Sequence, residues 1–269
     1  NFNRQLSYKT DTISKNMNSN IYLSIVVPCY NELQNLNNGA LLDLDNYLSK
    51  QNFTYEIIVS DDQSTDGSID YVQKHLNSHI HLLKNAHGGK AFALRAGLHN
   101  ARGAYTLFTD MDQSTPIDQV NKLIKFAESG FPVVIGSRGN QRKNSSIWRK
   151  LASNLFGIFR RSLLLSQIKD TQCGFKLVQT DIAKDIFSKM MIFDQTHSAK
   201  GWTVAAWDVE FLFLAQKFKH SIKEVPVKWE DSDLSTSKDR TAQKFIQESL
   251  DMIKQILRVR LNDLKGLYV

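Results

Sequence analysis

Short apolar runs alternate with amphipathic stretches along the first half of the chain. Four apolar runs stop at polar or turn residues and predict buried strands, at 22–28, 55–60, 105–109 and 132–136. The stretches between them carry apolar residues at helical spacing and predict helices, at 33–50, 68–76, 90–101 and 117–128. Strands that alternate with helices indicate βαβ units. We therefore expect an α/β fold with a mostly parallel central sheet flanked by helices, buried on both faces.

The second half of the chain predicts more helix and ends in a long amphipathic segment. Helical patterns cover 181–190 and 206–218, and an apolar run near 221–229 predicts another strand. Over 240–264, apolar and basic residues interleave at helical spacing: Ile246, Leu250, Ile253 and Leu257 with Lys254, Arg258 and Arg260. We expect a polar arm over 1–20, one domain over 21–238, and a helix over 239–269 that either packs on the sheet or lies at a membrane.

Composition and charge narrow the function classes. With 42% hydrophobic residues, the chain can bury a sizeable core, which excludes a disordered protein. Cys29 and Cys173 form no disulfide framework or metal-ligand spacing, so we expect a reducing compartment. No stretch reaches the about 18 apolar residues of a membrane span, and the first residues do not resemble a signal peptide. The net charge of +7 favours a polyanionic partner: nucleotide phosphates, anionic lipid or nucleic acid.

Positive charge is concentrated in one interval of the sequence. No acidic residue occurs between Glu128 and Asp170, whereas eight lysines and arginines do, among them Arg138 and Arg149. Arginine matches the geometry of phosphate oxygens, so both arginines are candidates for a phosphate contact. The alternative is a solvated basic face, which is the usual role of a run of charges.

Carboxylates follow the third predicted strand. Asp110 and Asp112 stand two residues apart in a turn, where they can address one Mg²⁺ or Mn²⁺ ion. The structural alternative is that Asp112 or Ser114 caps the helix that starts near Pro116. Because the carboxyl ends of parallel strands share one edge of a sheet, ligands bind there in open α/β folds.

Polar residues in other predicted turns could either bind a ligand or stabilise the local structure. Asp61 and Asp62 end the second strand, where a carboxylate can accept a hydrogen bond from a nucleobase, although capping of the next helix by Ser64 or Asp66 is the simpler reading. Lys90 follows two glycines at a helix start, where it can meet a phosphate or serve structure alone. Asp170 lies in a polar turn. Asp208 begins a helix, either favoured by the helix dipole or catalytic.

Taken together, these motifs resemble those of family 2 glycosyltransferases, which have the GT-A fold with a Rossmann-like nucleotide-binding half. The motifs occur in the family's order over about residues 22–230: Val26-Val-Pro-Cys-Tyr-Asn-Glu32, Asp61-Asp62-x-Ser64-x-Asp66-Gly67, Gly88-Gly89-Lys90, Asp110-x-Asp112, Gly136-Ser-Arg138, Asp170-Thr-Gln-Cys-Gly-Phe-Lys176 and Trp207-Asp-Val-Glu210. The last two resemble the polyprenyl-phosphate glucosyltransferases of the dolichyl-phosphate type. Met111 replaces the commoner alanine between the paired aspartates.

The resemblance implies a role for each candidate residue. The nucleotide sugar would be bound by Pro28, Tyr30, Glu32, Asp61, Asp62, Lys90, Asp110, Gln113 and Asp208, with Asp61 on the uracil edge. Asp110 and Asp112 would hold the metal on the diphosphate. Arg138 and Arg149 would meet the acceptor phosphate, and Asp170 would lie at the reaction centre. Catalysis would therefore involve Asp112, Arg138, Arg149 and Asp170.

The resemblance further implies an inverting, metal-dependent transfer of glucose from UDP-glucose to a polyprenyl (undecaprenyl or dolichyl) phosphate. We expect a peripheral enzyme at an anionic membrane surface, on its cytoplasmic face. The alternatives are the same chemistry with another nucleotide sugar (GDP-mannose, UDP-GlcNAc or UDP-galactose) or with a glycan acceptor. A nucleic-acid-binding protein would explain the charge but not the strand-end carboxylates, which repel phosphate unless they bind metal. A catalytically inactive, lectin-like scaffold is the remaining alternative.

Overall fold

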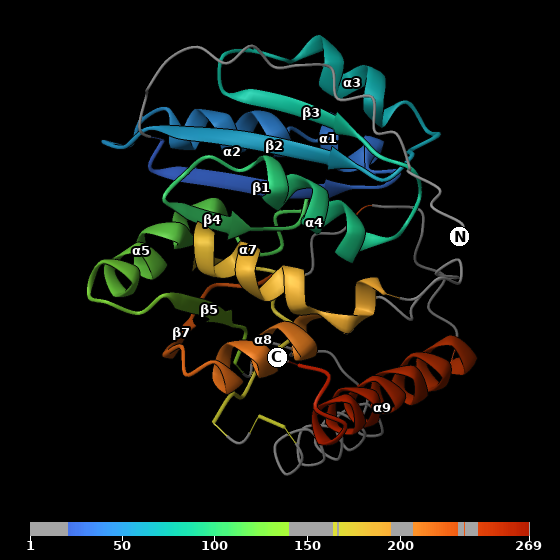
Figure 1. The fold of residues 1–269 in the computed structure, drawn as a ribbon. Helices are drawn as coiled ribbons and strands as arrows, with labels where there is room; N and C mark the ends of the chain where they lie inside the picture. Colours follow the sequence, from blue (N-terminus) through green and yellow to red (C-terminus); the bar gives the residue numbers. More distant parts are fainter. Residues whose placement is uncertain are drawn as a thin grey trace, which may run out of the picture.

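The computed structural model describes residues 21–139, 164–165, 167–194, 207–230, 234 and 242–268, and within 242–252 it describes the backbone alone. The described part forms a seven-stranded sheet in the order β3-β2-β1-β4-β6-β5-β7 (Figure 1). The strands are β1 (Leu23–Cys29), β2 (Tyr55–Asp61), β3 (Ile80–Lys84), β4 (Tyr105–Phe108), β5 (Val133–Ser137), β6 (Lys176–Gln179) and β7 (Ile222–Pro226). Only β6 pairs antiparallel with its neighbours within this sheet, which confirms the expected mostly parallel arrangement.

Helices cover both faces of the sheet. Along β1, Leu23, Ile25 and Val27 pack into one hydrophobic cluster and Val26 into the other, because successive side chains of a strand point to opposite faces. The first cluster includes residues of α2 and α5, and the second includes residues of α4, α7 and α8. The described helices are α1 (Leu33–Asn37), α2 (Ala40–Leu48), α3 (Ser68–Lys74), α4 (Lys90–Asn100), α5 (Val120–Glu128), α7 (Thr180–Lys189), α8 (Trp207–Lys217) and α9 (Ala242–Leu264), with the 3-10 helices η1 (Ile117–Gln119) and η2 (Met191–Phe193).

The structure departs from the predicted elements at three places. The helix expected over 33–50 is divided into α1 and α2, because Gly39 has a left-handed backbone with φ 92°. The helix expected over 117–128 begins as the 3-10 turn η1. Strands β3 and β6 were not predicted, since each is only four or five residues long. In addition, most residues of β3 are only half-buried, so this strand lacks the continuous apolar run of a buried strand.

The C-terminal amphipathic helix is present as α9, and it is held to α8 by a buried polar cluster. The Glu210 carboxylate is fully buried and accepts hydrogen bonds from Arg258 Nη2 (2.9 Å), Tyr268 Oη (2.9 Å) and Met191 N (2.7 Å). Burial raises the pKa of Glu210, while the Arg258 guanidinium opposes that rise. Neither α9 nor any other described helix has the length and apolar character needed to cross a membrane.

Candidate active site

The loops that follow β1 and β2 are bonded into one unit at the carboxyl end of the sheet. Backbone N–H groups of the first loop donate to side chains of the second: Asn31 N to Ser64 Oγ (3.0 Å), Glu32 N to Ser68 Oγ (2.9 Å) and Leu33 N to Asp66 Oδ2 (2.9 Å). Asp66 also accepts the backbone N–H of Ser68 at the start of α3 (2.9 Å), so it has the structural role considered above. These bonds fix the position of the strand-end residues beside them.

Asp61 occupies a buried position at the end of β2. Its Oδ2 accepts the backbone N–H of Ser64 at 3.0 Å. Its Oδ1 is buried and has no hydrogen-bond partner in the described part of the chain. A buried carboxylate oxygen without a partner is costly, so Oδ1 is suited to accept a donor from a ligand. Pro28 lies in β1 in register with Ser60, and the following Tyr30 is 41% exposed.

Asp62 faces a different group from its neighbour. Its two oxygens accept the backbone N–H groups of Gly88 and Gly89, each at 2.8 Å. Its Oδ2 also lies 3.0 Å from Nδ1 of His87, whose ring is 4.8 Å from that of Tyr30. Asp62 therefore shapes the glycine turn that leads into Lys90, and its predicted contact with the nucleotide sugar remains a prediction.

Lys90 and Asp110 meet at the centre of this edge. The ammonium of Lys90, at the start of α4, forms an ion pair with Oδ1 of Asp110, which follows β4. Burial alone would lower the pKa of Lys90, but Asp110 outweighs it and the pKa is raised. The other oxygen of Asp110 lies directly over Gly174, where an added Cβ would be 2.3 Å away. A side chain at position 174 would thus displace Asp110.

The turn after Asp110 does not cap the next helix. Asp112 Oδ1 accepts the N–H of Ser114 at 2.9 Å, within the turn itself. The 3-10 helix η1 has Pro116 at its N-cap, with no side-chain cap, so the capping alternative is wrong. Gln113 has φ 49°, donates Nε2 to the carbonyl of Asp110 at 2.8 Å, and has a buried Oε1 with no hydrogen-bond partner in the described structure. Asp110, Asp112 and Gln113 thus place side-chain oxygens that could be metal ligands in one turn.

These oxygens suit a divalent cation that takes its other ligands from a substrate. Mg²⁺ and Mn²⁺ prefer carboxylate and carbonyl oxygens, and Mg²⁺ in particular binds through one or two carboxylates plus substrate phosphates. Among the described residues, no group of three or more His, Cys, Asp and Glu is arranged to hold a metal. The two carboxylates and the amide of this turn could hold such a cation and leave its other positions open to substrate oxygens.

Arg138 and Asp170 form a two-pronged ion pair at the end of β5. Arg138 Nε and Nη2 lie 2.8 and 2.7 Å from the two oxygens of Asp170, and the backbone N–H of Arg138 donates to the same carboxylate at 3.0 Å. Burial would raise the pKa of Asp170, but these bonds outweigh it and lower the pKa to about 2. Asp170 is consequently ionised at neutral pH, and much of the charge of Arg138 is balanced within the protein.

Glu224 anchors the loop that carries Asp170, although nothing in the sequence pattern predicts this role. Its two oxygens accept the consecutive backbone N–H groups of Lys169 (3.0 Å) and Asp170 (2.8 Å). Glu224 lies in β7, opposite Ile135 in the parallel register of β5 and β7. No local motif marks this residue, because its partners lie more than fifty positions earlier in the chain. Only the pairing of β5 with β7 brings them together.

Replacing Glu224 with glutamine should reduce turnover while leaving substrate affinity nearly unchanged. The amide nitrogen of glutamine would face a backbone N–H in place of an acceptor, so the Asp170 loop would lose one bond of about 1.5–3 kcal/mol. We expect kcat to fall on the order of 10-fold, since small displacements of positioned groups reduce rate. Steady-state kinetics with Glu230→Gln, an exposed carboxylate nearby, as the control would measure this. Loss of stability with normal kcat would contradict the positioning role.

Asp208 and Lys176 form a second buried ion pair. Lys176 is fully buried in β6, and its ammonium lies 2.9 Å from Oδ1 of Asp208 and donates to the carbonyl of Cys173. Burial raises the pKa of Asp208, against the opposing effect of Lys176 and Lys90. Asp208 is thus electrostatically linked to the Lys90–Asp110 pair, and its predicted contact with the nucleotide sugar remains a prediction.

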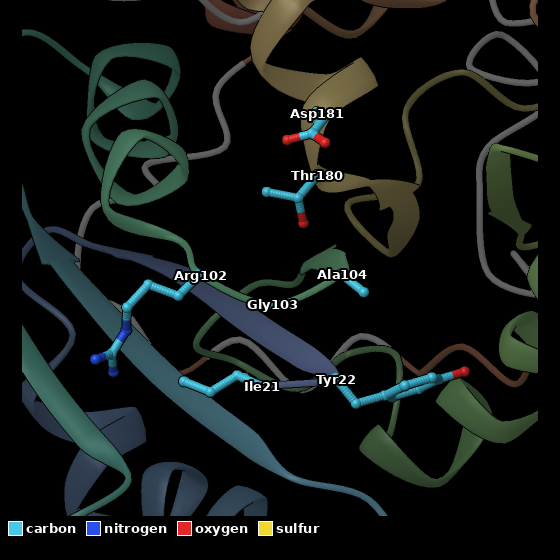
Figure 2. A pocket seen from close by; sticks show the side chains of 7 residues that line it. All are labelled: Ile21, Tyr22, Arg102, Gly103, Ala104, Thr180 and Asp181. Carbon is cyan, nitrogen blue, oxygen red and sulfur yellow. The ribbon is translucent and has the colours of Figure 1, made fainter. Parts of the chain in front are cut away.

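Arg149, the second arginine expected at the acceptor phosphate, falls outside the described residues. A pocket of about 320 Å³ lies at the amino ends of β1 and β4, the opposite edge of the sheet from the carboxylates. Figure 2 shows Arg102 and Tyr22 on its two sides; their polar atoms bond Glu56 and Glu128. The pocket is therefore separate from the site.

Comparison with known proteins decides the family. The model of the family described as Glycosyl transferase family 2 matches residues 24–187. This chain belongs to glycosyltransferase family 2. The match spans both strand-end aspartate motifs and the Asp170 loop, so the expected family is confirmed and the chain is a glycosyltransferase.

Several relatives of this family 2 glycosyltransferase share the same name. The dolichyl-phosphate beta-glucosyltransferase of Dictyostelium discoideum is 34% identical over 95% of this chain and 79% of its own length. The enzyme of the same name from Homo sapiens is 34% identical over 91% of this chain and 76% of its own. That from Saccharomyces cerevisiae is 31% identical over 92% and 77%.

Solved structures confirm the GT-A fold of this family 2 glycosyltransferase. Mannosyl-3-phosphoglycerate synthase from Rubrobacter xylanophilus has a TM-score of 0.62 at 15% identity, over 91% of this chain and 75% of that one. The mannosyltransferase PcManGT from Pyrobaculum calidifontis, solved with GDP-Man and Mn²⁺, has a TM-score of 0.54 at 15% identity, over 90% and 65%. At this identity the likeness concerns the fold alone.

Proposed function

We propose that this family 2 glycosyltransferase transfers glucose from UDP-glucose to a polyprenyl phosphate such as dolichyl phosphate, with inversion at the sugar and with Mg²⁺ or Mn²⁺. The observation that carries the proposal is the similarity to dolichyl-phosphate beta-glucosyltransferases. The similarity to the Dictyostelium discoideum enzyme extends over 95% of this chain. The arrangement of carboxylates and cations at the carboxyl edge of the sheet supports it independently.

The first two strand ends supply the proposed nucleotide subsite. Asp61 Oδ1, buried and without a protein partner in the described structure, is suited to accept the N–H of a uracil ring. Tyr30 is exposed beside His87 and offers an aromatic face to the base. Pro28 and Glu32 border the same loops and complete this subsite in the proposal.

The turn after β4 supplies the proposed diphosphate subsite. Asp110 and Asp112 would hold the cation, which when bound neutralises charge that develops on the departing diphosphate. Lys90, paired with Asp110, brings a positive charge to the same place. Gln113 keeps the turn in shape through its bond to the Asp110 carbonyl. Stabilisation of the leaving group is the main requirement of this reaction, and in the proposal these residues provide it.

Arg138 and Asp170 supply the proposed acceptor subsite. A phosphate monoester has a second pKa near ~6, so it is already mostly dianionic at neutral pH and needs positioning more than a general base. Since the pKa of Asp170 is about 2, this carboxylate is a poor base. We infer that Asp170 orients Arg138, which meets the acceptor phosphate, with Arg149 as a further contact. The acceptor attacks opposite the diphosphate, and the anomeric configuration inverts.

A panel of nucleotide sugars, with and without lipid phosphate, tests the proposal. UDP release should require a divalent cation and dolichyl phosphate, and it should be greatest with UDP-glucose. A preference for GDP-mannose, UDP-GlcNAc or UDP-galactose would show that the donor is not UDP-glucose. Release with a glycan in place of the lipid phosphate would show that the acceptor is a glycan. Absence of turnover with every donor would contradict the enzymatic proposal. The acceptor is a lipid, so we place the enzyme at an anionic membrane surface, on its cytoplasmic face.

A further inference from the structure

Helix α9 presents a line of leucines that are exposed in the described part of the structure. Leu257, Leu261 and Leu264 recur at steps of four and three residues and therefore share one face of the helix. They are 43%, 53% and 69% exposed, and Leu267, just beyond the helix, is 44% exposed. We call these four residues the leucine ridge. Exposed leucines that gather on one helix face indicate an interaction surface more strongly than scattered ones do.

The ridge is not the face by which α9 packs on the protein. Ile256 and Val259 are buried in the hydrophobic cluster that also contains α8. Lys217 of α8 binds Asp263 at 2.6 Å. The helix is therefore held to the protein by its opposite face, and the ridge points outward. The sequence pattern selected Ile253 and Leu257 as an apolar stripe, and the structure shows that this stripe leads into the exposed ridge.

Positive charges flank the leucine ridge. Lys254 lies on the same side of the helix as the leucines by helical spacing, and the exposed Lys265 directly follows Leu264. Asp263 is the one acidic residue between positions 254 and 268, and it is already engaged by Lys217 and by Arg260 (2.6 and 2.9 Å). Apolar side chains bordered by lysine and arginine are typical of helices that lie in the interface of an anionic membrane.

We propose that the leucine ridge, with Lys254 and Lys265, docks this protein onto an anionic lipid bilayer. Leucines enter the boundary between head groups and acyl chains, and the cations pair with anionic head groups. A second copy of this chain would instead bring like charges together, which disfavours a symmetric dimer on this surface. Figure 1 shows α9 on the side of the molecule toward which the arrows of β1, β2 and β3 point.

The proposal deepens the proposed function, on which it rests for the expectation of a lipid acceptor. Its test needs no donor and no polyprenyl phosphate, so the two can fail separately. Co-sedimentation of the full chain would use phosphatidylcholine vesicles with and without about 30 mol% phosphatidylserine, because anionic lipid supplies the attraction. We expect binding to the anionic vesicles that weakens as salt rises from about 50 to about 500 mM.

Matched variants separate the ridge from general surface effects. Replacing Leu257, Leu261 and Leu264 together with serine should weaken vesicle binding about 10-fold or more. The control replaces Leu42, Leu76 and Leu234, which are similarly exposed elsewhere, and should change binding less than about 2-fold. Lys254→Glu with Lys265→Glu should also weaken binding about 10-fold, against the exposed pair Lys50→Glu with Lys122→Glu.

A fluorophore keeps the proposal testable if the triple variant fails to fold. Leu264→Cys carrying an environment-sensitive dye should show a blue shift with anionic vesicles, whereas Leu42→Cys should not, and the native cysteines are buried. An unshifted spectrum at position 264, or equal vesicle binding by the ridge and control variants, would overturn the proposal. Light scattering that showed a dimer lost only in the ridge variants, without vesicle binding, would assign the surface to a second copy of the chain instead.

Discussion

An Asp112→Asn variant is expected to lose turnover by about 100-fold or more while it keeps its fold. In the proposed reaction a bound metal would contribute several kcal/mol to the stabilisation of the leaving diphosphate, and an amide would lack the charge that holds it. The fold is spared because the Asn side-chain oxygen can still accept the N–H of Ser114, the bond Asp112 makes at 2.9 Å. The measurement is kcat at saturating donor, together with the thermal unfolding temperature.

The control for this experiment is Asp118→Asn, a carboxylate in the neighbouring turn that is exposed to solvent. It should retain normal kcat. A titration of nucleotide binding with Mg²⁺ gives a second readout, because the dependence of affinity on the cation should disappear in Asp112→Asn. Near-normal turnover of this variant would show that Asp112 does not hold a catalytic metal.

A Gly174→Ala variant is expected to reduce turnover about 10- to 100-fold through the displacement of Asp110. The new methyl group would sit 2.3 Å from Asp110 Oδ2, which is far inside van der Waals contact, so the carboxylate must move. The cost in stability should be about 1–3 kcal/mol, as for other overpacked sites. Steady-state kinetics and chemical denaturation of the same preparation would measure both effects.

Gly130→Ala is the matched control for position 174. An added methyl group at Gly130 meets nothing within 4 Å, although φ of 99° strains any residue other than glycine. This variant should lose stability through its backbone and keep its turnover. If Gly174→Ala behaved in the same way, the close approach of Gly174 would have no part in holding Asp110, and the proposed diphosphate subsite would need another geometry.

The apolar runs predicted the central strands because these strands are buried on both faces. In β2, every residue from Tyr55 to Asp61 is buried, so the hydrophobic signal is interrupted only by Glu56 before the polar end of the strand. In β6 the signal is lost, since the strand has four residues and begins with the charged Lys176. That lysine is compatible with a buried strand because Asp208 and the carbonyl of Cys173 bind its ammonium, and sequence distance conceals the pairing with Asp208.

The strand ends indicated which carboxylates gather, but not what each one contacts. Adjacent residues Asp61 and Asp62 are equivalent in the sequence pattern, yet one keeps a buried oxygen without a protein partner in the described structure and the other holds the glycine turn. Arg138 was predicted from its charge, whereas its pairing with Asp170 depends on the reversal of direction at β6. Such partners are set by three-dimensional proximity, which residue type and spacing do not encode.

The buried cluster around Glu210 has a consequence for the order in which the chain can complete its folding during synthesis. Glu210 is made long before Arg258 and Tyr268, the two side chains that bond its carboxylate. A buried charge that lacks its partners costs about 3–5 kcal/mol. The α8 region therefore cannot reach its final packing until residues 258–268 have emerged from the ribosome, and nascent chains that stall before this point are expected to be substrates for chaperones and proteases.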